Sequence, residues 1–160
     1  MAAFHDRSID QVAGIVAVLS PGLAWKQNLM SAKQVLLGFP SSVIAGYGPN
    51  KKKAHRIACG SPIVSPQDIN GPKVSVFYRL IRDCGNDRDV CVDGHAANMA
   101  LGRGKRRLRD SDTSQAEIEL VQEAFRLAAR QLKLKPCWVQ AATWIAWRSS
   151  NGFQQGRLEF

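Results

Sequence analysis

The chain has 160 residues, of which 45% are hydrophobic, so it is long enough for one domain with a packed core and short for two. It has no run of about 18 apolar residues, which excludes a membrane span, and its N-terminus lacks a signal-peptide layout, so we expect a cytoplasmic protein. The net charge of +9, from 22 Lys and Arg against 13 Asp and Glu, favours a polyanionic partner, most often nucleic acid.

The first part of the chain carries three helical patterns. Residues 8–20, "SIDQVAGIVAVLS", place apolar side chains at positions 9, 12, 16 and 19, with Ser8 or Asp6 as the cap. Residues 24–39, "AWKQNLMSAKQVLLGF", predict a second amphipathic helix, and residues 50–60, "NKKKAHRIACG", predict a basic one.

Two further helices are predicted in the middle of the chain. Pro72 suits the first turn of a helix over residues 72–84, because its missing N–H has no intrahelical partner there. The next helix, over "DGHAANMALG", is expected to be capped by Asp93 and stopped by Gly102.

The last two helices are predicted from a capping box and from a run of aromatic residues. Ser114 and Glu117 have capping-box spacing at the start of residues 114–135. The expected buried stripe of this helix consists of Ile118, Val121, Phe125, Ala128 and Leu132. Residues 136–148, "PCWVQAATWIAWR", are apolar on nearly every side and predict a central, enclosed helix.

No segment shows the alternating pattern of a strand, so we predict an all-α fold of about seven helices. A compact single domain is expected over residues 1–152, with a flexible tail over 153–160. The four cysteines lack C-x-x-C spacing and are expected to be reduced core thiols. Because the three histidines lie in unrelated segments, no metal or other cofactor is expected.

The positive charge is concentrated in two clusters, which are typical of phosphate-binding surfaces. The first consists of Lys51, Lys52, Lys53 and Arg56, with His55 among them. The second consists of Arg103, Lys105, Arg106, Arg107 and Arg109. Alternatively, such clusters only keep the protein soluble.

Asp93, His95 and Lys73 are the candidates for chemistry. Taken alone, Asp93 is typical of an N-cap that accepts a backbone N–H, and His95 of a structural histidine. Lys73 is less ordinary, because the dipole at the start of a helix disfavours a cation. A phosphate bound at that helix end, or a reactive amine held in a cleft, would explain it.

The segments "GPKVSVFYRLI" and "VCVDGHAANMALG" resemble the helix-hairpin-helix DNA glycosylase superfamily, which includes endonuclease III and 8-oxoguanine glycosylase. In that family a lysine opens the helix after a glycine-rich hairpin, and V-D-x-H follows at an interval like the 20 residues between Lys73 and Asp93. The resemblance extends over about residues 8–102. The closing "PCWVQAATWIAWR" resembles short uncharacterised proteins of bacteriophage, which would place the protein in the host cytoplasm.

The resemblance implies base excision from DNA, with the target base flipped out of the duplex. Lys73 would attack C1′ of the deoxyribose and form a Schiff base, and Asp93 would assist departure of the base. Asn70 and Gly71 would hold phosphate, with His95 in support. The hairpin here, "QDINGPK", has one glycine where the family has two, so Asn70 would have to supply a second left-handed position.

Three functions are therefore considered. The first is a DNA glycosylase or abasic-site lyase acting on damaged or modified bases, working as a monomer. The second is a non-catalytic DNA-binding accessory protein on the same fold. The third is a bacteriophage protein that handles modified bases or binds a host protein.

Overall fold

The computed structural model describes residues 7–60, 68–103 and 113–150. Over these residues it is all-α, with seven helices and no strand, as the sequence predicted. No helix in this part of the chain is long and apolar enough to cross a membrane. The chain divides into two compact units, unit 1 (Met1–Cys84) and unit 2 (Gly85–Phe160), each with its own hydrophobic core. Whether they behave as one domain stays a prediction.

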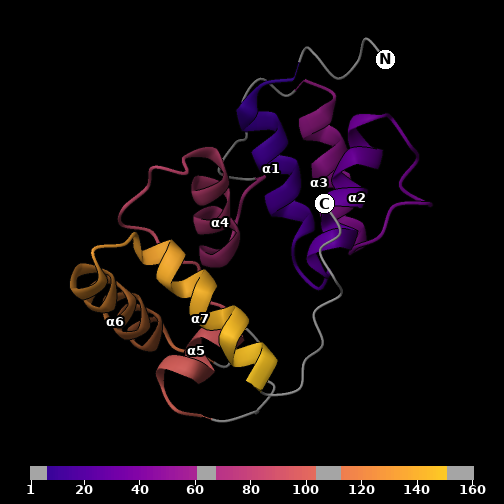
Figure 1. Ribbon diagram of the computed structural model, residues 1–160. Coiled ribbons are helices and arrows are strands. Elements are labelled where there is room, and N and C mark those ends of the chain that lie inside the picture. Colours follow the sequence, from indigo (N-terminus) through magenta and orange to yellow (C-terminus); the bar gives the residue numbers. More distant parts are fainter. Residues whose placement is uncertain (1–6, 61–67, 104–112, 151–160) are drawn as a thin grey trace. The chain divides into compact units, whose positions relative to one another are not determined.

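Unit 1 is built around α1 (Ile9–Leu19), which packs against α2 (Trp25–Leu36), α3 (Gly48–Ala58) and α4 (Pro72–Arg82) (Figure 1). A capping box starts α1, because Ser8 Oγ accepts from the N–H of Gln11 (3.1 Å) and Gln11 Oε1 accepts from the N–H of Ser8 (3.1 Å). Every residue from position 13 to 19 is buried, so α1 is the enclosed helix of this unit.

The first turn of α1 is more exposed than the helical spacing of its apolar residues predicted. Ile9, the first residue of the expected apolar stripe, is 72% exposed. One turn of α4 is fixed to the same end of α1 by polar contacts, since Tyr78 Oη donates to Asp10 Oδ1 (3.2 Å) and Arg82 Nε lies 2.5 Å from that carboxylate. Burial, followed by the charge of Asp10, raises the pKa of Tyr78. This contact holds α4 in place against the core.

Unit 2 consists of α5 (Gly94–Ala100), α6 (Gln115–Leu132) and α7 (Pro136–Ser150), which pack against one another. The predicted capping box is confirmed, because Ser114 Oγ accepts from the N–H of Glu117 (3.3 Å) and Glu117 Oε2 accepts from the N–H of Ser114 (2.9 Å). The hydrogen bond from the backbone of Ser114, followed by one from the side chain of Arg103, lowers the pKa of Glu117.

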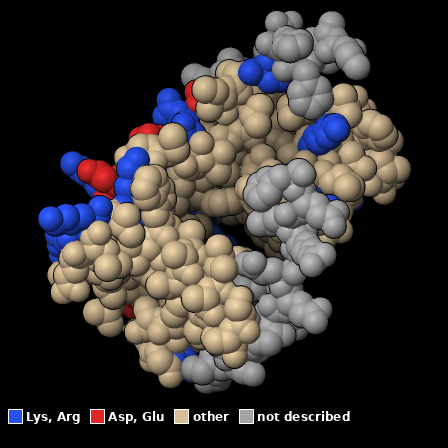
Figure 2. Space-filling model, in the orientation of Figure 1, with Lys and Arg blue, Asp and Glu red and all other residues tan. Residues whose placement is uncertain are grey.

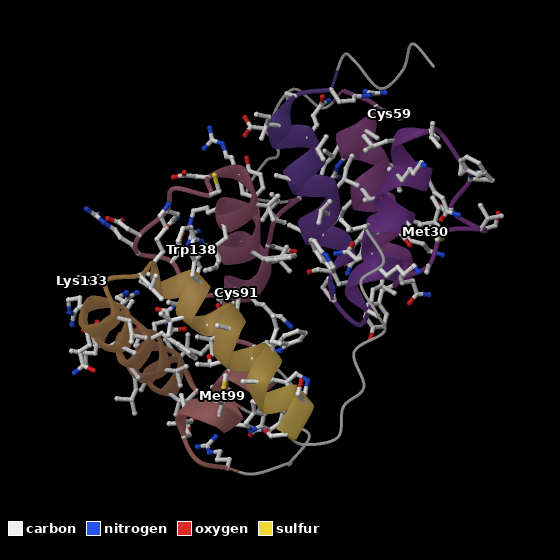
Figure 3. The ribbon with its side chains drawn as sticks, in the orientation of Figure 1. Met30, Cys59, Cys91, Met99, Lys133 and Trp138 are labelled. Atoms are coloured by element: carbon white, nitrogen blue, oxygen red, sulfur yellow. The ribbon has the colours of Figure 1, made fainter. Side chains whose placement is uncertain are left out.

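Two expectations about unit 2 are wrong. The prediction that α7 is enclosed fails, because Trp138 is 54% and Ile145 is 45% exposed; Figure 3 shows Trp138 on α7. The stripe of α6 is also displaced, since Leu132 is 60% exposed and Ala129, which was not expected in the core, is buried. Helices that are apolar all round can remain at the surface when too few neighbours are present to cover them.

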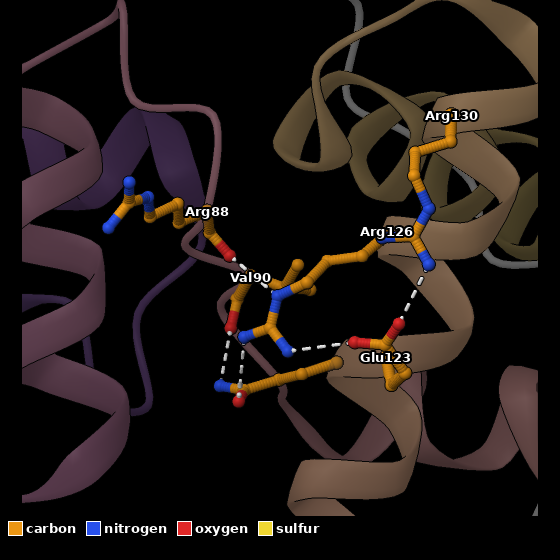
Figure 4. Close-up of polar contacts among 6 residues, drawn as sticks. Arg88, Val90, Glu123, Arg126 and Arg130 are labelled. Carbon is orange, nitrogen blue, oxygen red and sulfur yellow. Dashed lines mark hydrogen bonds and ion pairs between the residues drawn. The ribbon is translucent and has the colours of Figure 1, made fainter.

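The extended segment before α5 is held by side chains of α6 and α7. The amide of Gln140 bonds both backbone groups of Cys91, donating to its carbonyl (2.6 Å) and accepting from its N–H (3.2 Å). On α6, Gln122 donates to the carbonyl of Val90 (3.2 Å) and Arg126 Nε donates to that of Arg88 (3.1 Å) (Figure 4). These bonds satisfy backbone groups of an extended segment that pairs with no strand within the described residues.

The cysteines are free thiols in the structure. The expectation that they lie in the core is wrong: Cys59 and Cys84 are exposed, and Cys91 and Cys137 are only partly buried. Figure 3 labels Cys59 near the end of α3. Cys59 and Cys84 are therefore the accessible thiols among the four.

Candidate functional site

The N-terminal end of α4 carries three of the residues that the sequence singled out. Gly71 is the N-cap with φ of 97°, Pro72 follows as the first helical residue, and Lys73 is the second. A Cβ on Gly71 would meet nothing within 4 Å, so glycine is required here by the left-handed backbone and not by a close neighbour. Because glycine has no side chain, it provides no cap for the backbone N–H groups of this helix end.

A side chain of α3 contacts the residue that precedes this helix end. Lys53 Nζ donates to Asn70 Oδ1 at 2.5 Å. Asn70 does not supply a second left-handed position, because Lys133 is the one non-glycine residue with positive φ in the described ranges. The role implied for its backbone is therefore wrong. Its side chain instead joins the loop to the basic helix.

The four cations of the first cluster have different environments. Lys51 Nζ is turned inward and donates to the carbonyls of Ser41 (2.8 Å) and Ile44 (3.2 Å). Arg56 forms an ion pair with Asp68, whose side chain is 3% exposed. Lys52 is exposed. Thus Lys51, Lys53 and Arg56 each have a protein partner, and Lys52 presents its charge on the outside of α3; the bond from Lys53 to Asn70 is itself exposed to solvent.

An aromatic pair lies close to Lys73 along α4. Trp25, at the start of α2, meets Phe77 edge to face, with ring centroids 6.2 Å apart and the planes at 70°. Lys73 and Phe77 are four residues apart on one helix and so share a face. Trp25 is 46% exposed, so part of its ring remains available at the surface of unit 1.

Asp93 is the N-cap of α5, as predicted. Its Oδ1 accepts from the N–H of Ala96 at 2.8 Å. His95, in the first turn, contacts two aromatic rings of α7, with centroid distances of 6.3 Å to Trp144 and 5.3 Å to Trp147. Both side chains therefore help to fix α5 within unit 2.

The two predicted catalytic residues belong to different units: Lys73 lies in unit 1 and Asp93 in unit 2. Each has a defined local position at the start of a helix. Their action as a pair stays a prediction.

The second basic cluster is described only at its first residue. Arg103 forms an ion pair with Glu117 and so binds the start of α6. Lys105, Arg106 and Arg107 lie outside the described residues. No group of three or more His, Cys, Asp or Glu side chains suited to a metal ion occurs within the described ranges.

Sequence reasoning missed Asp68, and for Asn70, which it expected to hold phosphate, it missed the side-chain contact with Lys53. Asp68 is 2% exposed and is paired with Arg56, and Asn70 accepts from Lys53. The available signal was the group of basic residues at positions 52, 53 and 56, followed along the chain by the polar residues Asp68 and Asn70. Such spacing does not identify which cation meets which acceptor.

The described chain is thus an all-α protein of two helical units, the first of which combines a basic helix with an uncapped helix end. The profile of a family described as "Family of unknown function (DUF7178)" matches residues 1–151. The chain therefore belongs to the DUF7178 family. No curated protein and no solved structure matches it.

Proposed function

We propose that the protein binds duplex DNA through the phosphate backbone, without catalysis, and that unit 1 supplies the contact. The binding surface, here named the α3–α4 surface, consists of Lys52, Lys53, Asn70, Gly71 and Lys73. The observation that carries the proposal is the hydrogen bond from Lys53 to Asn70, which brings a cation of α3 to the residue directly before the N-cap of α4.

Phosphate suits this surface for two reasons. The start of a helix has a partial positive charge and backbone N–H groups directed outward, and Gly71 leaves this end open. Lys73 adds a full positive charge at the same end, so both the helix end and the side chain attract a phosphate. The lysines of α3 then extend the contact along the backbone.

The distribution of charge agrees with this assignment. Residues 1–84 hold 10 Lys and Arg against 4 Asp and Glu, so they carry +6 of the net charge of +9. The view in Figure 2 shows more surface from Lys and Arg than from Asp and Glu. A basic unit of this kind attracts DNA in a salt-dependent manner.

Binding should be measured by fluorescence anisotropy on a labelled duplex between 50 and 200 mM salt, the range over which phosphate contacts lose affinity most visibly. The variant Lys52→Glu/Lys73→Glu should bind at least about tenfold more weakly and lower the slope of log K against log salt by about 2, since two phosphate contacts are lost. The unmodified protein should bind with Kd of about 10⁻⁴ to 10⁻⁶ M.

The matched control is Lys26→Glu/Lys33→Glu, which makes the same change of charge on two exposed lysines of α2. It should reduce the affinity clearly less than the α3–α4 variant does. Equal losses in both variants would mean that DNA responds only to net charge. An unchanged affinity in the α3–α4 variant would reject the surface.

Base excision is the second candidate function. It is favoured by the position of Lys73 in the first turn of α4, directly after a glycine with positive φ, which matches the arrangement that the resemblance implies. An amine at the start of a helix could attack the sugar of a nucleotide whose phosphate is bound there. Asp93 keeps its carboxylate at a fixed position because it caps α5.

Borohydride trapping on abasic and modified DNA tests this candidate. If Lys73 is the nucleophile, the unmodified protein should form a covalent adduct that Lys73→Ala abolishes, whereas Lys26→Ala should leave the adduct unchanged. Asp93→Asn retains an oxygen that can cap α5, so it should fold normally and abolish release of the base. Salt-dependent binding without an adduct or base release would leave the non-catalytic proposal standing alone.

A further inference from the structure

Helix α6 has a second apolar stripe that the core of unit 2 does not use. Leu120 and Leu127 are seven residues apart and are 61% and 50% exposed. Ala116 and Ala124, four residues before and after Leu120, are exposed on the same face. Both leucines and both alanines therefore form one continuous apolar line along the outside of the helix.

The core-facing side of α6 lies elsewhere on its circumference. Val121, Phe125 and Ala129 are buried there and pack in the core of unit 2. At 100° per residue, the direction of Phe125 is about 140–160° from those of Leu120 and Leu127. An amphipathic surface helix needs only one apolar side, so the outer stripe calls for a partner.

The charges beside the stripe change sign along the helix. On one flank, Glu119 and Glu123 lie in the N-terminal half, and Arg126 and Arg130 in the C-terminal half. Within the chain, Glu123 accepts from Arg126 (3.3 Å) and from Arg130 (2.8 Å), as Figure 4 shows. These exposed pairs hold the side chains along the edge of the stripe and lower the pKa of Glu123, with the hydrogen bond from Arg130 as the largest cause.

We propose that α6 pairs with α6 of a second copy of this chain in an antiparallel arrangement. Reversal places Leu120 of one copy beside Leu127 of the other, because both are equally far from the middle of the helix. In the antiparallel pair each flank faces the same flank of its partner in reverse, so the acidic half meets the basic half. In a parallel pair this flank would instead face the partner's other flank, which consists of Glu117, Ala124 and Ala128 and offers no matching set of charges. The alanines allow the helices to approach to about 8–10 Å.

A second copy fits this face better than other partners do. When α6 is reversed about a point near residue 124, its exposed leucines meet leucines and its acidic residues meet basic ones, as a two-fold symmetric interface requires. The two glutamates and two arginines of the flank cancel in charge, so the flank has no net positive charge to attract nucleic acid. The inference does not depend on DNA binding, since α6 carries no residue of the α3–α4 surface.

Disulfide trapping tests the direction of pairing. The full-length protein, purified at high salt to remove nucleic acid, is used in a background with the exposed Cys59 and Cys84 replaced by serine. An antiparallel pair places position 116 of one copy near position 131 of the other, so an equimolar mixture of Ala116→Cys and Gln131→Cys should give a disulfide-linked dimer. Ala124→Cys alone should also do so, because position 124 lies near the two-fold axis.

Ala116→Cys alone decides between the two directions. Its thiols should lie about 25 Å apart in the antiparallel pair, given the rise of about 1.5 Å per residue, so it should not form a covalent dimer. Covalent dimer from Ala116→Cys alone would show parallel pairing and overturn the proposal. Absence of dimer from both the mixture and Ala124→Cys would overturn it as well.

The mass in solution gives an independent measurement. Sedimentation at about 10–100 μM, a range suited to a weak single-helix interface, should show dimers for the unmodified protein and at least a tenfold weaker association for Leu120→Glu/Leu127→Glu. The matched control is Leu132→Glu, on the same helix and 60% exposed but off the stripe, which should leave association unchanged. A monomer for the unmodified protein, or equal losses in both variants at unchanged circular dichroism, would reject the α6 pair.

Discussion

Replacing Phe125 by alanine should destabilise unit 2 by about 3–5 kcal/mol, the usual cost of removing a buried phenylalanine side chain and leaving a cavity. Phe125 is 6% exposed and packs with Val121, Ala129 and Val139. Because small folded units have a net stability of about 5–15 kcal/mol, this loss is a large fraction of the total. Urea unfolding of the full chain, followed by circular dichroism, should show helical signal lost at a lower midpoint.

The control is Leu132→Ala on the same helix. Leu132 is 60% exposed, so its truncation should change the free energy of unfolding by no more than about 0.5 kcal/mol. The comparison is informative because the sequence pattern placed both residues in one buried stripe. Losses of similar size in the two variants would show that Leu132 is buried and would contradict the structure.

Helical spacing alone could not separate Phe125 from Leu132. The two residues are seven apart and point in nearly the same direction, so any pattern of period 3.6 assigns them to one face. What differs is the presence of a neighbour. Helix α6 ends at Leu132, where Lys133 takes the left-handed conformation (φ of 54°) and the N–H of Leu134 bonds the carbonyl of Ala129 (3.0 Å). At that end no core remains to cover the leucine.

Features that depend on a few adjacent residues were predictable. The cap at Asp93, the capping box at Ser114 and Glu117, and Pro72 in the first turn of α4 all occur as expected, because each is decided by contacts within one turn of helix. The same kind of local pattern predicted about seven helices and an all-α fold, and the described residues form seven helices.

The partners of the candidate site were not predictable, because they connect separate elements. Lys53 meets Asn70 across 17 residues of chain, and Arg56 meets Asp68 across the same connection. A run of cations on a helix indicates only that the helix is basic. Tertiary packing decides which of them remain outside for a ligand, and here it turns Lys51 and Arg56 toward protein groups.

Arg56→Ala should therefore reduce the stability of unit 1 by about 2–3 kcal/mol, because it removes the guanidinium that compensates a buried carboxylate. Asp68 is 2% exposed, whereas the side chain of Arg56 is 55% exposed, so part of the ion pair is already screened by water. For this reason we expect less than the full cost of breaking a wholly buried pair. Urea unfolding near pH 7 measures the change.

The double variant Arg56→Ala/Asp68→Asn should recover more than half of that loss, since a neutral amide is far less costly to bury than a carboxylate that has lost the positive charge of Arg56. Lys52→Ala, an exposed change on the same helix, should leave the unfolding midpoint unchanged and weaken DNA binding instead. If Arg56→Ala weakened DNA binding and left stability intact, Arg56 would belong to the binding surface and not to the structure that supports it.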